Sequence, residues 1–164
     1  MRMRDIIFYE EEQSDAASTG TYIKFVPDDD SKNRIYEIAK DLVENPLDPK
    51  EYHMTIVYSR KEFNPGHSER PIMASADITT LEPLGDGGSH VLHVDCDFAH
   101  KKHEYYRDVY GATHDYESFT PHVTITYDGT IIDKNFKEKL DRIGPINFVK
   151  EVVEDLDLDW KDKL

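Results

Sequence analysis

The sequence is poor in cysteine and in long apolar runs, and it has far fewer basic than acidic residues. Its single cysteine, Cys96, excludes an internal disulfide and is compatible with a reducing compartment. The 20 lysines and arginines are outnumbered by 34 aspartates and glutamates, so the formal net charge is −14. Such a chain repels a long polyanion, and we expect no broad basic face for long nucleic acid. Any anionic ligand should be small and bound locally.

The apolar runs are too short for membrane insertion. Near the start, Arg2 and Arg4 precede only a short apolar stretch at residues 6–8, whereas a membrane span needs about 20 residues. We therefore expect a cytoplasmic protein without a membrane partner. The chain has 164 residues, 38% of them apolar, and it contains 10 tyrosines and 7 phenylalanines. This composition can build the core of one compact domain over residues 1–164.

Apolar periodicity and turn residues predict an α+β chain. The first helix is expected over residues 31–44, with Ser31 as its N-cap and Pro46 beyond its end. Further helices are expected over residues 100–110, ending at Gly111, and over residues 133–143. Strands are expected over residues 21–26, 53–58, 71–81, 89–98, 122–127 and 146–153.

The order strand, helix, strand occurs twice with the same spacing. The first expected helix begins at Ser31 and is followed by His53, and the second begins at His100 and is followed by His122. The interval from helix start to histidine is the same in both cases. Two ordinary strand-helix-strand units would give the same order without any repeat. The matching histidines favour two pseudo-symmetric halves.

A four-residue motif, histidine-apolar-threonine-apolar, begins at His53 and again at His122. A shuffled chain of this composition would contain the motif about 0.07 times, so two occurrences are informative. Residues two apart on a strand point to the same side, so Thr55 lies beside His53 and Thr124 lies beside His122. Each strand therefore presents an imidazole next to a hydroxyl.

This combination of side chains suits phosphodiester cleavage. A neutral imidazole can take the proton of the attacking oxygen and a protonated one can donate to the leaving oxygen, because the unperturbed pKa of histidine is about 6.5. Threonine hydroxyls can donate to the non-bridging phosphate oxygens without a metal. The alternative is that each histidine is an ordinary buried strand residue. The occurrence of two matching motifs argues against this alternative.

Two His-x-Thr strands, one in each half of a strand-helix-strand repeat, resemble the two-histidine (2H) phosphoesterase superfamily. The spacing from His53 to His122, the opening strand around Tyr22 and the acidic tail ending at Trp160 are most similar to the phage anti-CBASS phosphodiesterases. Those enzymes degrade the cyclic oligonucleotide signals of bacterial immunity. The resemblance implies a bilobed, LigT-like fold, with lobes over residues 20–85 and 86–160 that can exchange strands. It also implies a central cleft holding the active site, and no required metal or cofactor.

The resemblance further implies contacts to the nucleobases from an aromatic residue on the first strand and from an acidic and an aromatic residue near the C-terminus. Tyr22, Glu154 and Trp160 fit these places. On a strand, Tyr22 shares a face with Lys24, so a ring for a base and a cation for a phosphate would lie side by side. Tyr22 could instead be structural, and Trp160 could pack the tail against the body. Three acidic residues compete with Glu154 for its role, namely Glu151, Asp155 and Asp157.

A rival interpretation is a metal site built from closely spaced histidines. The residues concerned are His90, His93, Asp95, Asp97, His100 and His103. Histidines three apart on a strand face opposite sides, which is poor geometry for one ion, so we expect no bound metal. His67 and His114 are expected at the surface, and Cys96 in a buried strand.

The predicted activity is a metal-independent phosphodiesterase whose partner is a small cyclic di- or trinucleotide. Two alternatives stay open. One is a 2′,3′-cyclic phosphodiesterase or RNA-end-processing enzyme, which the same histidines permit. The other is a module that sequesters a nucleotide without cleaving it. Sequestration needs phosphate donors but no acid-base pair, so the presence of both histidines and both threonines favours catalysis.

Overall fold

The computed structural model describes residues 19–85 and 87–157, which form six strands, three α-helices and one 3₁₀ helix. The strands are β1 (Thr19–Pro27), β2 (Met54–Ser59), β3 (Glu69–Leu84), β4 (Ser89–Asp95), β5 (His122–Thr126) and β6 (Ile146–Asp157). The helices are α1 (Asp29–Leu42), α2 (Asp97–Tyr110), α3 (Lys137–Ile143) and the 3₁₀ helix η1 (Pro49–Glu51). The described chain is thus α+β.

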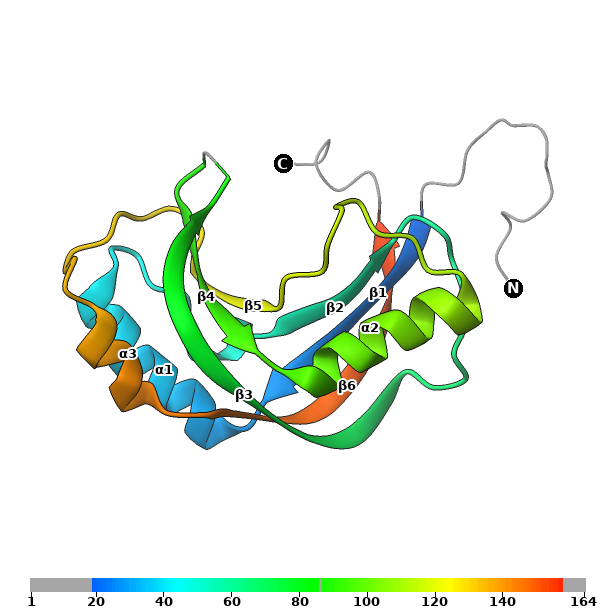
Figure 1. The fold of residues 1–164 in the computed structure, drawn as a ribbon, viewed down its shortest axis with the longest axis horizontal. Helices are drawn as coiled ribbons and strands as arrows, with labels where there is room; N and C mark the ends of the chain where they lie inside the picture. Colours follow the sequence, from blue (N-terminus) through cyan, green and yellow to red (C-terminus); the bar gives the residue numbers. More distant parts are fainter. Residues whose placement is uncertain (1–18, 86, 158–164) are drawn as a thin grey trace.

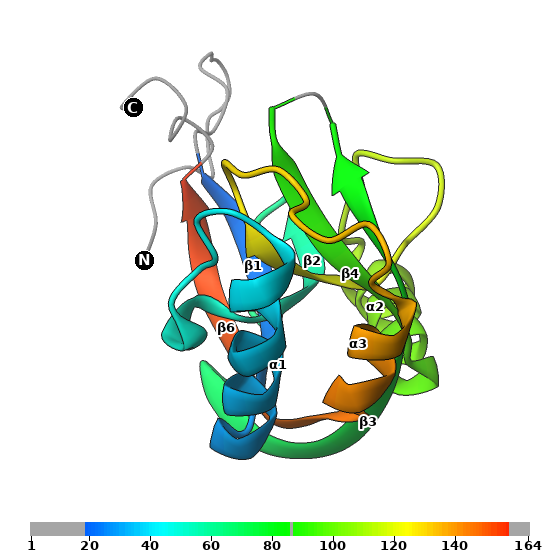
Figure 2. The same ribbon diagram turned by 90° about the vertical axis from the view of Figure 1, so that its left-hand side faces the viewer.

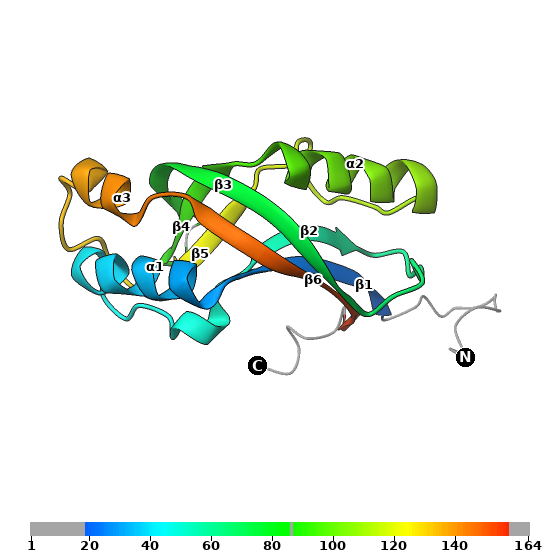
Figure 3. The ribbon, with the colours of Figure 1, turned by 90° about the horizontal axis from the view of Figure 1, so that it is seen from below.

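The six strands close into an antiparallel barrel in the order β1-β2-β5-β4-β3-β6, and β6 returns to pair with β1. Helices α1 and α3 lie side by side near one end of the molecule, and α2 lies toward the other end (Figure 1 and Figure 3). Figure 2 looks from the α1 and α3 end and shows the curved path of β3 below the other strands. Closure gives each of these strands a partner on both sides.

The two strand-helix-strand units, β1-α1-β2 and β4-α2-β5, meet at the centre of one side of the barrel. Within each unit the two strands pair with each other, and β2 pairs with β5 between the units. Strands β3 and β6 complete the barrel and link the halves, since β3 pairs with β4 and β6, and β6 pairs with β1. A division into two lobes near residue 85 stays a prediction.

Helix α1 starts slightly before its expected first residue. Its N-cap is Asp28, whose carboxylate accepts the backbone N–H of Ser31 at 2.8 Å, so the expectation that Ser31 caps the helix was wrong. Ser31 is fully buried inside the first turn, and its hydroxyl accepts the backbone N–H of Asn147 on β6 at 2.9 Å. The hydrogen bond from Ser31 stabilises the charged carboxylate and lowers the pKa of Asp28.

Two other boundaries differ from those expected. Strand β4 ends at Asp95 because Cys96 is the N-cap of α2, so Cys96 is buried as expected but lies outside the strand. Burial raises the pKa of its thiol. Helix α3 begins only at Lys137, since Asp133 instead accepts the backbone N–H of Asn135 in a turn and pairs with Lys139.

The core fills the barrel interior and the spaces beneath the helices. Its largest fully buried side chains come from strands, from all three α-helices and from the residue after η1; they are Tyr52, Tyr106, Phe25, Phe148, Ile23, Ile35, Leu42, Met54, Ile56, Leu92, Ile125 and Ile143. Within the described residues, no helix is both long and apolar enough to cross a membrane.

Candidate active site

The pairing of β2 with β5 brings the two histidine motifs together. Met54 pairs with Val123, and both side chains are fully buried. Continued by one residue each way, this antiparallel register sets His53 opposite Thr124 and His122 opposite Thr55. The four flanking side chains are half-buried on the other face of the two strands. Each histidine thus lies near the threonine of its own motif and that of the other.

Both imidazoles are held in the same way. The Nδ1 atom of His53 lies 2.9 Å from the carbonyl oxygen of Glu51, and that of His122 lies 2.8 Å from the carbonyl oxygen of Thr120. A carbonyl can only accept, so Nδ1 carries the proton in each ring and Nε2 is left for proton exchange. Among the described residues, neither Nε2 has a hydrogen-bond partner.

The pKa of each histidine lies below the ordinary value. Burial is the main cause for both, because it disfavours the charged imidazolium. The positive charges of Lys24 and His122 lower the pKa of His53 further, and the charge of His93 does the same for His122. In the absence of a bound anion both rings therefore favour the neutral form at neutral pH.

Tyr22 is hydrogen-bonded to one of the motif threonines. Its hydroxyl lies 2.7 Å from Oγ1 of Thr55, and its ring meets the ring of His53 edge-on, with 6.3 Å between the centroids. Burial raises the pKa of Tyr22 to about 12, so the phenol keeps its proton throughout the neutral range. When Tyr22 donates to Thr55, the threonine hydrogen remains available for a third group.

Lys24 and Glu154 lie close to Tyr22 in the sheet. Glu154 on β6 pairs directly with Tyr22 in the β1-β6 register, and Lys24 pairs with Thr55 in the β1-β2 register. The Lys24 ammonium lies 3.8 Å from the Glu154 carboxylate. The structure therefore gathers three of the four expected binding residues beside the first motif. The fourth, Trp160, lies outside the described residues.

Glu151, one of the acidic competitors of Glu154, is fully buried and occupied elsewhere. Its carboxylate receives Arg70 and His67 at 3.0 Å each, the hydroxyl of Tyr106 at 3.0 Å, and the ammonium of Lys102 at 3.4 Å. The expectation that His67 is a surface histidine was wrong, since its side chain is largely buried against this carboxylate. Glu151 joins β6, β3 and α2 and does not face the histidine pair.

His93 is a neighbour of the site that sequence reasoning did not assign to it. It pairs with His122 in the β4-β5 register, and the two ring centroids lie 6.3 Å apart. Its Nε2 atom lies 3.3 Å from a carboxylate oxygen of Glu82 on β3. Cross-strand register alone creates this arrangement, so no local pattern in the sequence could have revealed it.

The histidines of the metal interpretation are dispersed among separate partners. His90 lies against the carbonyl oxygen of Gly88, and His93 against Glu82. His103 uses its Nδ1 atom on the carbonyl oxygen of Ile56. In residues 19–85 and 87–157, no group of three or more histidine, cysteine, aspartate or glutamate side chains could hold a metal ion.

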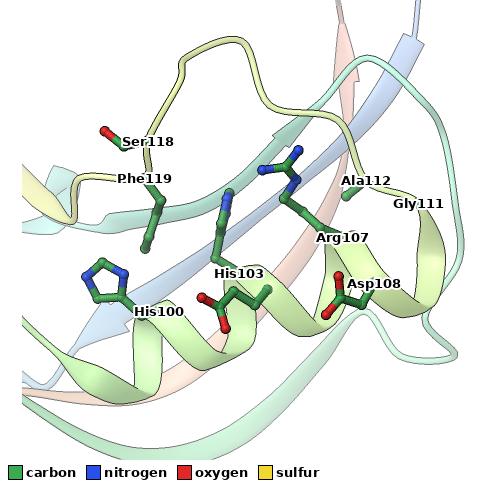
Figure 4. Close-up of a pocket in the computed structure, with 9 residues that line it drawn as sticks. His100, His103, Arg107, Asp108, Gly111, Ala112, Ser118 and Phe119 are labelled. Atoms are coloured by element: carbon green, nitrogen blue, oxygen red, sulfur yellow. The ribbon is translucent and has the colours of Figure 1, made fainter.

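An open pocket of about 540 Å³ lies between α2 and the loop that follows it. From α2, His103 and Arg107 point toward the loop that carries Ser118 and Phe119 (Figure 4). The Phe119 ring stacks on His103 with 4.2 Å between centroids, and His114 meets His103 edge-on at 4.6 Å. His114 is thus half-buried in this aromatic cluster, not simply a surface histidine. None of the paired histidines or threonines lines the pocket.

Comparisons with known proteins establish the family of this chain. Residues 19–163 match the family model described as "Anti-CBASS protein Acb1", so the chain belongs to the anti-CBASS protein Acb1 family. The resemblance to the anti-CBASS proteins inferred from the motifs is thereby confirmed. Membership of the wider two-histidine superfamily stays a prediction.

Relatives bearing the name anti-CBASS protein Acb1 come from several bacteriophages. The protein of Vibrio phage KVP40 is 33% identical over 150 residues, which is 87% of this chain and 91% of that protein. The protein of Yersinia phage phiR1-RT is 34% identical over 155 residues, 92% of this chain and 97% of that protein. The protein of Enterobacteria phage T4 is 29% identical over 160 residues, 90% of this chain and 95% of that protein.

Proposed function

We propose that this protein is a phosphodiesterase that counters CBASS immunity by cleaving 3′,5′ bonds in cyclic di- or trinucleotides, through an acid-base pair that needs no metal. The observation that carries the proposal is the matched anchoring of His53 and His122. Both rings donate from Nδ1 to a carbonyl two residues earlier, so in both rings Nε2 is the atom placed to exchange a proton. The names of the phage relatives support the biological role.

In the first step, one neutral imidazole accepts the proton of a ribose 2′-hydroxyl as that oxygen attacks the adjacent phosphorus. The bond from phosphorus to the 5′ oxygen breaks, and the other imidazole, protonated, donates its proton to that leaving oxygen. The ring opens and a 2′,3′-cyclic phosphate remains. Water then opens this phosphate with the two roles exchanged, which leaves a 3′-phosphate and restores both protonation states.

The lowered pKa of both histidines is compatible with this assignment. Binding an anionic phosphate between the rings stabilises an imidazolium and so favours protonation of one of them. The free protein then holds two neutral rings, and the substrate itself promotes the mixed state that catalysis needs. Each proton transfer would supply about 10²- to 10⁴-fold in rate, with the rest from positioning and charge stabilisation.

The threonines supply the donors to the phosphate. Thr55 and Thr124 flank the histidines, and their hydroxyls can donate to the non-bridging oxygens on which charge develops. A hydroxyl of Tyr22 that donates to Thr55 orients the Thr55 hydrogen toward the phosphate and polarises it. Thr124 has no hydrogen bond of this kind among the described residues. The two phosphate donors are therefore unequal.

The bilobed two-histidine fold is part of the proposal. It is supported by the arrangement β1-β2-β5-β4, in which two equivalent strand-helix-strand units meet through the strands that carry the motifs. The phage origin of the relatives supports the expectation that the substrate is met inside an infected bacterial cell.

The proposal is tested with a panel of cyclic dinucleotides, cyclic trinucleotides, 2′,3′-cyclic mononucleotides and short RNA, with products identified by mass. We expect opening of the cyclic di- or trinucleotides in the presence of chelator. His53→Ala and His122→Ala should each reduce turnover by at least about 10²-fold, while His100→Ala, which alters an exposed histidine on α2, serves as the matched control. Cleavage of only the 2′,3′-cyclic mononucleotides or RNA would favour the end-processing alternative. Binding without products would favour sequestration.

A further inference from the structure

The similarity between the two histidine motifs extends beyond the fourth residue. Each motif continues to a tyrosine at the fifth position after the histidine, Tyr58 in the first half and Tyr127 in the second. In a regular strand, a residue five positions after the histidine points to the opposite face, toward the core. The two tyrosines would then be buried structural residues. The structure shows otherwise.

A β-bulge in each strand turns its tyrosine to the face of the histidine and threonine. On β2, Val57 and Thr55 pair with adjacent residues of β1, and Ile56 is the extra residue between them. On β5, Thr126 and Thr124 pair with adjacent residues of β4, and Ile125 is the extra residue. The extra residue takes the same place in both motifs, directly after the threonine.

The burial pattern records the same change of face. Ile56 and Val57 are consecutive and each 1% exposed, and Ile125 and Thr126 are consecutive and fully buried. The alternation of inward and outward residues therefore skips one position before the tyrosines. Tyr127 emerges 54% exposed, and Tyr58 half-buried.

Each bulge is anchored from outside its own pair of strands. The carbonyl oxygen of Ile56 accepts the Nδ1 proton of His103 on α2 at 2.7 Å, and the carbonyl oxygen of Ile125 accepts the backbone N–H of Leu47 at 2.8 Å. A bulge interrupts the regular hydrogen bonds between two strands. Here the carbonyl oxygen of each extra residue accepts a hydrogen bond from a residue outside the paired strands. The hydrogen bond from His103 thus holds the bulge that sets the face of Tyr58. This role of His103 involves no metal ion.

Tyr58 lies beside the first histidine-threonine motif, and Tyr127 directly follows the strand that carries the second. The Tyr58 ring meets the Tyr22 ring edge-on, with 6.4 Å between centroids, and the hydroxyl of Tyr22 reaches Thr55. Tyr58 also pairs directly with Tyr22 in the β1-β2 register. Because β2 and β5 are antiparallel, the two tyrosines approach this centre from opposite directions.

We propose that Tyr58 and Tyr127 are binding residues for the two nucleosides on either side of the cleaved phosphate, each offering a ring surface to one base. The inference rests on the proposed function, since it takes the phosphate to lie at the histidines. All four bases stack on aromatic side chains. This pair of tyrosines would therefore favour a substrate that has a base on each side of the cleaved phosphodiester. A pseudo-symmetric pair of rings suits a cyclic dinucleotide, which is itself close to two-fold symmetric.

The test uses a cyclic dinucleotide of 2′-deoxyadenosine, which lacks the attacking hydroxyl and so reports binding alone. We expect Tyr127→Leu and Tyr58→Leu each to raise its Kd by about 5- to 150-fold, the range that stacking one base represents, and the double variant to multiply the two effects. Tyr127→Phe and Tyr58→Phe, which keep the ring, should bind nearly as the unaltered protein does. Tyr116→Leu, at a tyrosine 77% exposed, is the matched control.

A 2′,3′-cyclic mononucleotide has a single base and should be sensitive to only one of the two tyrosines. Tyr127 is more than half exposed, so its leucine variant is expected to fold and decides the proposal even where Tyr58→Leu is unstable. Binding by Tyr127→Leu within twofold of the unaltered protein, while the ribose form is still cleaved, would overturn this inference and leave the proposed function intact. Tyrosine-dependent binding without cleavage of the ribose form would overturn the function alone. A protein that binds no cyclic dinucleotide would overturn both.

Discussion

Two glutamates on β6, Glu151 and Glu154, should differ sharply in what they do. Glu151 is fully buried, with its two carboxylate oxygens sharing four partners from β3, α2 and the segment before β3. Glu154 is 48% exposed and, within the described part of the chain, forms one ion pair, with Lys24 at 3.8 Å. Replacing each by glutamine keeps its size and removes its charge. We expect Glu151→Gln to destabilise the protein and Glu154→Gln to weaken nucleotide binding.

The expected loss in the free energy of unfolding for Glu151→Gln follows from the positive charges that a neutral glutamine no longer balances. Arg70 and Lys102 lose their shared counter-charge, and Lys102 and His67 are themselves mostly buried. Removing one partner of a buried ion pair costs about 3–5 kcal/mol, because the other charge stays buried and uncompensated. Glu154→Gln breaks only an exposed, loosely formed pair, which is worth about 0–1 kcal/mol.

Urea unfolding followed by circular dichroism measures the difference. With an m-value of about 2 kcal/mol/M, Glu151→Gln should lower the midpoint by about 1.5 to 2.5 M at unchanged m, while Glu154→Gln should lower it by less than about 0.5 M. Below the unfolding transition, Glu151→Gln should bind a cyclic dinucleotide normally. Equal midpoints for the two variants, or a binding defect confined to Glu151→Gln, would refute the separation of roles.

Three further predictions concern the histidine-threonine site. His53→Ala and His122→Ala should each reduce kcat by at least about 10²-fold, and the double variant should be little worse than either, because the two act as a unit; additive losses would argue against an acid-base pair. Since burial lowers the pKa of both histidines, kcat/KM should peak below pH 6.5 and fall toward pH 8 as the imidazolium needed as acid disappears; a profile rising to pH 8 would contradict this. Tyr22→Phe should cost about 0.5–1.5 kcal/mol in kcat/KM through the lost bond to Thr55. A double-mutant cycle should show that this loss couples to Thr55→Val and not to Thr124→Val; equal coupling to both threonines would refute the relay.

Most of the element positions could be predicted because they depend on local patterns. Alternating apolar residues marked the strands that carry His53 and His122, and Gly111 ends α2 in the left-handed conformation, with a φ of 71°. The errors arose where two local signals competed. Asp28 and Ser31 are both good N-caps, and only the buried position of Ser31 beneath β6 decides between them.

The candidate site was predictable as a set of residues but not as an arrangement. The repeated motif identified both histidines and both threonines, because a short repeat is visible in the sequence itself. Tyr58 and Tyr127 also repeat, yet regular strand alternation directs them to the core. Their actual face depends on bulges whose carbonyls are held by Leu47 and His103 from distant parts of the chain.

The two histidine-threonine pairs on matching strands can be read from the chain alone, because motif and period are local properties. The pairing of β2 with β5, which sets each histidine opposite the threonine of the other motif, depends on the folded barrel. Tertiary packing likewise buried Glu151 among cations and left Glu154 beside Tyr22, although both lie on one acidic strand. Register and burial are set by contacts between residues far apart in the chain, which no local pattern contains.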